Sequence, residues 1–297
     1  MAGLPGDPQQ RLVPDVPTLL LAKIGSFLPL RKGADSEYAE RLVALAGPVI
    51  DTRTPLAITR LRMGSLSRGD FTYGWSTPDR NAFRGAYRAW HRELLAHPEQ
   101  TPDSTLGDDL PIGVPTSFVR NLPGHPVPRD LDVAVLGDFR TANHKSGIDE
   151  AVRNVLAALP AEQRIGVWHQ EAFGRAGAKR ADMHTAWWDI VQSDSRLSPL
   201  TRLTQARVGR LIITDPAALL LLGHADCTVT VGSIEMWLTP APLEVAAGEP
   251  PLDLLAASDV CFDWFGRRPR WVFAPHLSAD QREAVAEAMP QLDVSGS

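Results

Sequence analysis

The regular alternation of short apolar runs with helical segments after residue 130 limits this chain to one class of fold. Five runs have the length and composition of strands buried on both faces, at residues 131–139, 164–170, 210–216, 227–233 and 270–275. Segments with helical periodicity separate several of them, at 148–159, 183–191, 216–222 and 279–289. Strands that alternate with helices form right-handed crossovers and a parallel sheet. The sequence therefore predicts an α/β fold with a doubly wound, Rossmann-like parallel sheet.

The chain before this region has a different composition. Residues 95–130 are rich in Pro, Gly and Asp and follow no regular period, which is typical of a linker. Residues 1–94 contain two predicted helices, at about 35–46 and 78–95, and two short predicted strands within 47–62. We therefore expect three parts: a small α+β segment over 1–94, a Pro/Gly-rich linker over 95–130 and the α/β domain over 131–297.

Composition and charge limit the classes of binding partner and the cellular location that we expect for this chain. The chain is 44% hydrophobic and 22% charged, as in globular proteins, and its formal net charge of -5 gives no general reason to bind nucleic acid. Lys23 and Gly25 interrupt the apolar run at 19–30, so it does not predict a transmembrane segment. Cys227 and Cys261 lie in apolar surroundings and are typical of buried thiols in a reducing compartment. We expect a cytoplasmic protein whose association with a membrane, if any, depends on its partners.

Candidate ligand-binding residues follow from the predicted strand ends, because parallel sheets bind ligands at the carboxyl ends of their strands. This rule selects Asp138, Arg140, His169 and Asp215, together with neighbours that include Gly232 and Ser233. Asp138 and Arg140 could bind a phosphate or a sugar, or form an ion pair within the loop. His169 could polarise a hydroxyl group, or be a hydrogen-bonded histidine of the core.

The common cofactor motifs are absent from the sequence. The turn after the first predicted strand, GDFRTANHKSG, lacks the spaced glycines of dinucleotide-binding sites, and the chain has neither a P-loop nor Cys/His spacing for zinc. Its Asp-x-Asp pair, Asp130 and Asp132, leads into a strand, whereas a carboxylate pair that holds a metal-bound nucleotide needs an exposed turn. The sequence thus predicts no metal site and indicates no cofactor.

Two long segments resemble a known family of enzymes. Residues 17–42, PTLLLAKIGSFLPLRKGADSEYAERL, and 55–91, PLAITRLRMGSLSRGDFTYGWSTPDRNAFRGAYRAWH, are similar to the acceptor half of actinobacterial family 2 glycosyltransferases, which have a GT-A domain. VLGDFR, IGVWH and WFGRRPRWVFAP in the later region resemble the Rossmann-like part that follows in such proteins. The resemblance implies a small remnant of a GT-A domain followed by a domain similar to one half of a GT-B enzyme.

The resemblance also implies roles for residues in the RKGADSE segment. In an inverting glycosyltransferase a carboxylate accepts the proton of the acceptor hydroxyl, and this role falls to Asp35, with Glu37 as the second catalytic carboxylate. Arg31 and Lys32 of the same segment would contact the substrate. A structural alternative is that Asp35 or Ser36 caps the helix while Glu37 favours its positive end.

The resemblance does not extend to a nucleotide-sugar site, because the residues before Pro17 are too few to form the donor-binding half. Two functions therefore stay open. The first is hexosyl transfer from a nucleotide sugar to a glycan acceptor of the cell envelope or another polysaccharide, as in cell wall biosynthesis, in a chain that is part of a larger enzyme. A protein partner would then supply the donor site, with Mg²⁺ or Mn²⁺ if that site requires it. The second is a non-catalytic binding or scaffold module of a glycosyltransferase system.

Overall fold

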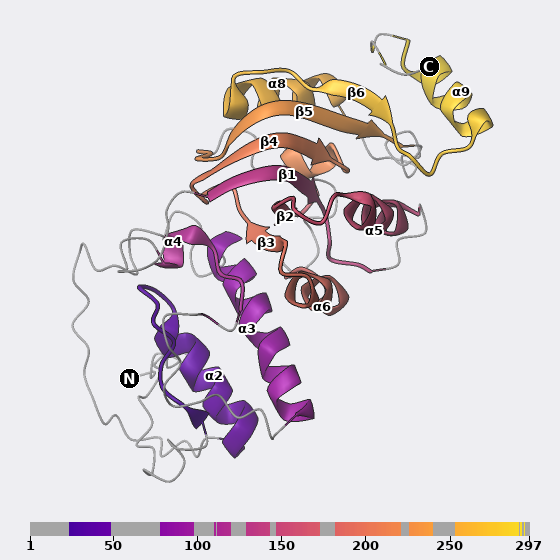
Figure 1. Cartoon of the computed structure of the whole chain (residues 1–297). Helices are drawn as coiled ribbons and strands as arrows, with labels where there is room; N and C mark the ends of the chain where they lie inside the picture. The colour runs from indigo at the N-terminus through magenta and orange to yellow at the C-terminus, as the bar shows by residue number, and fades with distance from the viewer. Residues whose placement is uncertain are drawn as a thin grey trace, which may run out of the picture.

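A six-stranded sheet, parallel throughout, forms the centre of the protein (Figure 1). This computed structural model describes residues 24–48, 78–97, 110, 112–119, 129–142, 147–172, 182–220, 226–239, 253–290, 292 and 294. The strand order is β3-β2-β1-β4-β5-β6, which is the order of Rossmann folds. The strands are β1 (Arg129–Gly137), β2 (Ile165–His169), β3 (Leu197–Leu200), β4 (Ala206–Ile213), β5 (Thr230–Leu238) and β6 (Arg270–Phe273). The predicted α/β class with a doubly wound parallel sheet is confirmed, and β3 is an addition to the five predicted strands.

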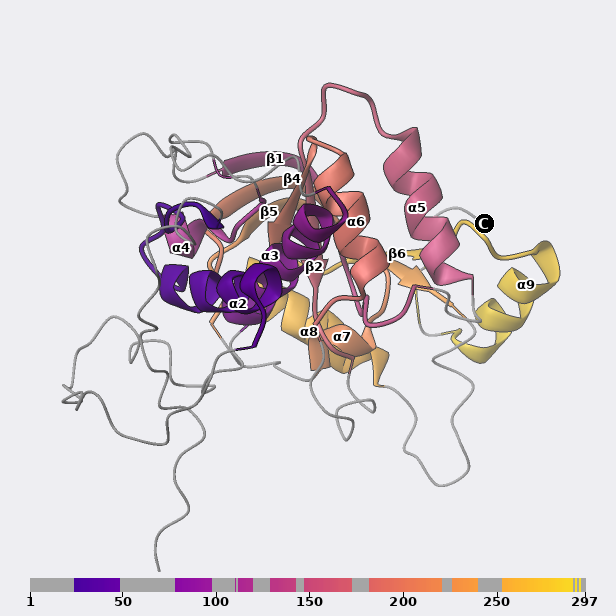
Figure 2. The ribbon, with the colours of Figure 1, turned by 90° about the horizontal axis from the view of Figure 1, so that it is seen from below.

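Helices cover both faces of the sheet. The described helices are α2 (Ala34–Ala46), α3 (Pro78–Ala96), α4 (Thr116–Val119), α5 (Ile148–Ala158), α6 (Thr185–Ser193), α7 (Ala217–Leu220), α8 (Leu254–Phe265) and α9 (Ala279–Ala288). Helices α3, α5 and α6 lie on one side, and α7 and α8 lie on the other (Figures 1 and 2). Helix α2 packs against α3 rather than directly on the sheet. Among the described helices, none is both long enough and apolar enough to cross a membrane.

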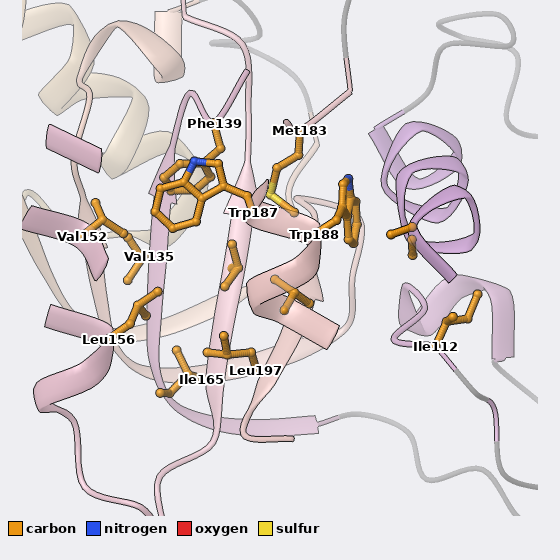
Figure 3. Packing of buried hydrophobic residues seen from close by; sticks show 14 of the residues in the cluster. Ile112, Val135, Phe139, Val152, Leu156, Ile165, Met183, Trp187, Trp188 and Leu197 are labelled. Atoms are coloured by element: carbon orange, nitrogen blue, oxygen red, sulfur yellow. The ribbon is translucent and has the colours of Figure 1, made fainter. Parts of the chain in front are cut away.

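Each face of the sheet has its own hydrophobic core. Val135 and Ile165 point to the side of α5 and α6, where Phe139, Met183 and Trp187 lie close together (Figure 3). Leu136 and Trp168 point to the opposite side, towards α7 and α8. The strands are thus buried on both faces, which explains why their sequences are nearly continuous runs of apolar residues.

In the neighbouring strands β1, β4 and β5, the regular alternation of side chains between the two faces of the sheet is interrupted towards the amino end. Core residues on the face of α7 and α8 are three positions apart in each of them: Leu131 and Ala134, Val208 and Leu211, Val231 and Ile234. An added Cβ on Gly232 would lie only 2.5 Å from the carbonyl oxygen of Gly209, so this contact requires glycine. The expectation that Gly232 and Ser233 lie at the carboxyl edge is wrong, because β5 continues to Leu238. In the sequence, the Gly-Ser pair looks like a turn that ends the strand.

The predicted helix near residue 35 is present, but neither Asp35 nor Ser36 caps it. Its N-cap is Gly33, with a φ of 76° and no side-chain cap, while Asp35 lies in the first turn with its side chain exposed. A Cβ on Gly33 would lie 2.9 Å from the ring of Phe83. Glycine satisfies both the left-handed backbone and this close contact. The two strands predicted within 47–62, apart from residues 47 and 48, lie outside the described residues.

Candidate functional site

The candidate site lies where the chain leaves the carboxyl ends of β1, β2 and β4. In this strand order the connections after β1 and β4 run to opposite sides of the sheet, which makes this edge the switch point where sheets of this kind bind ligands. Asp138 follows β1, His169 is the last residue of β2, and Asp215 comes two residues after β4. We call this edge of the sheet, with the loops that follow it, the rim.

Asp138 and Arg140 form a closely coupled pair at the rim. The Asp138 side chain is 1% exposed and that of Arg140 is 11% exposed. Arg140 donates hydrogen bonds from Nε to Oδ1 at 2.9 Å and from Nη2 to Oδ2 at 2.5 Å, and the backbone N–H of Ala172 also donates to Oδ2 at 3.0 Å. Burial raises the pKa of the Asp138 carboxyl, but these hydrogen bonds outweigh burial and hold the pKa below its usual range. The ion pair thus fixes a guanidinium group at the rim.

His169 and Asp215 both hold backbone groups in place. The Nδ1 atom of His169 accepts a hydrogen bond from the backbone N–H of Phe139 at 3.0 Å, which places the proton of the neutral ring on Nε2. Asp215 Oδ1 accepts a hydrogen bond from the N–H of Ala217 at 3.0 Å, at the start of α7. Each residue therefore stabilises a loop of the rim.

The ends of β1 and β4 approach each other closely. Thr214 donates a hydrogen bond from Oγ1 to the carbonyl oxygen of Leu136 at 3.1 Å. A Cβ on Gly137 would collide with that hydroxyl oxygen, so the approach requires glycine at this position. The strong Asp138 hydrogen bond raises the pKa of Arg140 against the effect of burial, and the charges of Glu171 and Asp215 contribute in the same direction. Carboxylates from the loops after β1, β2 and β4 therefore all interact electrostatically with the guanidinium group of Arg140.

The rim also includes residues that the sequence did not reveal. The backbone N–H of His184 donates to the carbonyl oxygen of Phe139 at 2.8 Å, which brings Asp182 near the end of β1. The charge of Asp182 interacts with that of Glu171 and with Arg84 and Arg88 of α3. Glu171 follows β2 by two residues, so the strand-end rule could have selected it. Asp182 has no such signal, because its place depends on the fold of the chain between β2 and α6.

Asp35 and Glu37, the two predicted catalytic carboxylates, belong to a different layer from the rim. Figures 1 and 2 show α3 between α2 and α6. Asp35 is exposed, whereas Glu37 is fully buried: its Oε1 atom lies 3.0 Å from Nε of Arg41 and 2.9 Å from Nε2 of His91. These contacts give Glu37 a structural role in joining α2 to α3.

The basic pair before α2 is placed by the backbone. The N–H of Arg31 donates to the carbonyl oxygen of Phe118 at 2.9 Å, and its side chain is exposed, while Lys32 is half-buried. The hydrogen bond to Phe118 places the backbone of Arg31 beside α4. Sequence reasoning also missed His91, although Tyr87 and Trp90 beside it mark the buried stripe of α3.

Within the described ranges, no group of three or more His, Cys, Asp or Glu side chains is arranged to hold a metal ion. Cys227 and Cys261 are free thiols, and burial raises their pKa to about 11 and about 12. Neither thiol is therefore a reactive thiolate at neutral pH.

Comparison of the chain with protein family models, with curated proteins and with solved structures finds no match in any of the three. The case for function therefore depends on the geometry of the rim.

Proposed function

We propose that the rim binds a sugar and that the protein acts in hexosyl transfer from a nucleotide sugar to a glycan acceptor of the cell envelope or another polysaccharide, as part of a larger enzyme. One observation carries the proposal: Asp138 holds the Arg140 guanidinium at the switch point of a Rossmann-like sheet, where its charge interacts with those of Glu171 and Asp215. A fixed guanidinium and nearby carboxylates offer the donors and acceptors that sugar hydroxyls need. A cytoplasmic location belongs to the same proposal.

The first helix after β1 favours a sugar acceptor over a nucleotide at the rim. In dinucleotide-binding Rossmann folds, the pyrophosphate lies at the N-terminus of this helix. Here that helix is α5, and its first turn carries Asp149 and Glu150, with Asp149 buried. Negative charge at this position repels phosphate. The same observation favours our second candidate function, a non-catalytic module that binds a glycan while a protein partner holds the nucleotide sugar and any Mg²⁺ or Mn²⁺.

Ligand titration tests the proposal. We expect hexoses or disaccharides to shift NMR signals of Gly137 and Thr214, because these residues form the rim. Arg140→Gln should abolish the shifts, whereas Arg129→Gln, at the exposed amino end of β1, should leave them unchanged. Calorimetric titration with UDP- and GDP-sugars plus Mg²⁺ should detect weak binding or none. A nucleotide-sugar site with a binding free energy beyond about -8 kcal/mol would contradict the acceptor assignment.

A second arm separates the enzyme from the non-catalytic module. By resemblance, Asp35 is the proposed proton acceptor. Because Asp35 lies in a different layer from the rim, it can act only on another sugar unit of an extended glycan whose bound part occupies the rim. Asp35→Asn should therefore lower sugar transfer by roughly 10²–10⁴-fold while sugar binding at the rim stays unchanged. Asp280→Asn is the matched control, because Asp280 lies in the first turn of α9 as Asp35 does in α2. Transfer at the wild-type rate in Asp35→Asn would favour the non-catalytic module.

A further inference from the structure

Asp182 lies at the junction of three parts of the protein. Its segment is anchored to the end of β1 by the hydrogen bond from His184 to Phe139, and the indole N–H of Trp187 donates to the carbonyl oxygen of Thr141 at 3.0 Å. Met183 and Phe139 belong to the same hydrophobic core, and Figure 3 shows Trp188 directed towards α3. Asp182 thus sits between the loop after β1 and the side of α3 that carries Arg84 and Arg88.

The carboxylate of Asp182 has an unusual environment for a charged group. Only 26% of its side chain is exposed, and its ion-pair contact is a long one, 3.9 Å from Nη1 of Arg88. Arg88 instead donates from Nε to Glu40 at 2.8 Å. No described residue donates a hydrogen bond to Asp182. A largely buried carboxylate without hydrogen bonds lowers the stability of the folded protein, and such groups concentrate at functional sites.

We infer that Asp182 is a ligand-contacting residue of the rim, where its carboxylate accepts a hydrogen bond from a sugar hydroxyl. This inference rests on the proposed function and adds α3 as one wall of the site. Asp138 does not compete for this role, because Arg140 and Ala172 already supply its hydrogen bonds. Asp182 retains accepting capacity that a ligand can use.

The charges around Asp182 determine how it affects stability. Burial raises its pKa, Arg84 and Arg88 oppose this rise, and Glu40 and Glu171 add to it, so that the pKa lies above the usual value for aspartate. An acid with a raised native pKa binds more protons in the folded state than in the unfolded state. Stability then falls as pH rises from the unfolded pKa through the native one.

Thermal unfolding of Asp182→Asn tests this environment without a ligand. At pH 7 we expect the melting temperature to rise by about 2 °C, because the variant removes the buried charge. The rise should disappear near pH 3, where Asp182 is protonated. Asp189→Asn is the control, because Asp189 lies on α6 with its side chain 64% exposed, and its melting temperature should not change. A lower melting temperature for Asp182→Asn at pH 7 would overturn the inference, since it would make Asp182 a structural partner of Arg88.

Sugar titration of the same variants completes the test. A hexose or disaccharide that binds the wild type should bind Asp182→Asn roughly tenfold more weakly, the usual loss for a hydrogen bond to a charged group, and Asp189→Asn without change. Equal affinity for the wild type and Asp182→Asn would overturn the inference and leave the proposed function standing. A wild-type protein that binds none of these sugars would overturn both, and this outcome is recognisable because it needs no variant.

Discussion

At the scale of single residues, the most consequential group outside the rim is the buried pair of Glu37 and Arg41. Both side chains are fully buried, and Arg41 also donates to the carbonyl oxygens of Ile24 at 2.8 Å and Ser26 at 2.6 Å. The guanidinium lies 5.2 Å from the ring centre of Trp90. The carboxylate and the guanidinium compensate each other's buried charge, and the pair joins the segment before α2 to α3.

Glu37→Gln should strongly destabilise the protein. Without the carboxylate, the Arg41 charge stays buried and loses its counter-ion, which costs roughly 3–5 kcal/mol of unfolding free energy. Urea unfolding followed by tryptophan fluorescence measures this loss, because Trp90 contacts Arg41. Asp35→Asn is the control on the same helix and should unfold like the wild type, because Asp35 is exposed and caps nothing. Equal stability of Glu37→Gln and the wild type would show that the pair contributes no net stability.

At the scale of secondary structure, the sequence predicts elements that carry their own periodicity and misses those that depend on their neighbours. The sequence predicts the five strands other than β3, each an apolar run, and the helices α2, α3, α5, α6, α7 and α9. Strand β3 was not, because its four residues, LSPL, include a proline, and only pairing with β2 makes them a strand. Helix α8 was missed because its apolar residues extend around much of its circumference, without a clear polar stripe.

The sequence predicts some residues of the candidate site and misses others. Asp138, Arg140, His169 and Asp215 follow from the rule that strand ends meet at one edge. Asp182 and His91 do not, because their positions depend on how α6 and α3 pack. Asp35 and Glu37 lie two residues apart on one helix, but Glu37 is buried against Arg41 and His91 whereas Asp35 is exposed.

The contact between α3 and α6 depends on one glycine. A Cβ on Gly85 would lie 2.7 Å from Cζ2 of Trp188, and both residues are buried. In a helix interior, Gly→Ala normally stabilises by roughly 0.5–1 kcal/mol. Here we expect Gly85→Ala to destabilise by about 1–3 kcal/mol, because the added methyl group forces the two helices apart.

Urea unfolding of a double variant tests the cause of that loss. Trp188→Phe removes the indole atoms that the new methyl group would meet, so the double variant Gly85→Ala/Trp188→Phe should lose less stability than the sum of the single variants. Simple additivity would show that the contact between Gly85 and Trp188 does not limit the approach of α3 to α6.

At the scale of the whole molecule, one hydrophobic core crosses the boundary that composition suggests. The cluster on the face of α5 and α6 contains Phe83 and Trp90 of α3, Phe118 of α4, and Val135 of β1. The predicted segments 1–94 and 131–297 therefore share buried surface, although residues 95–130 have the composition of a linker. Burial of each large apolar side chain stabilises by roughly 1.5–3 kcal/mol, so several such side chains can hold α3 in place without an intact connection.

Limited proteolysis distinguishes a shared core from two independent domains. We expect the first cleavage within 95–130, because its Pro, Gly and Asp content is typical of linkers. The two fragments should then elute together in size-exclusion chromatography, because α3 still packs against α6 and the sheet, and they should separate only in denaturant. Gly85→Ala should make the cleaved fragments separate at a lower urea concentration, because it weakens the same contact.

First cleavage inside 164–233 would contradict the predicted division. Elution of the 131–297 fragment as a stable monomer would show that the sheet does not need α3.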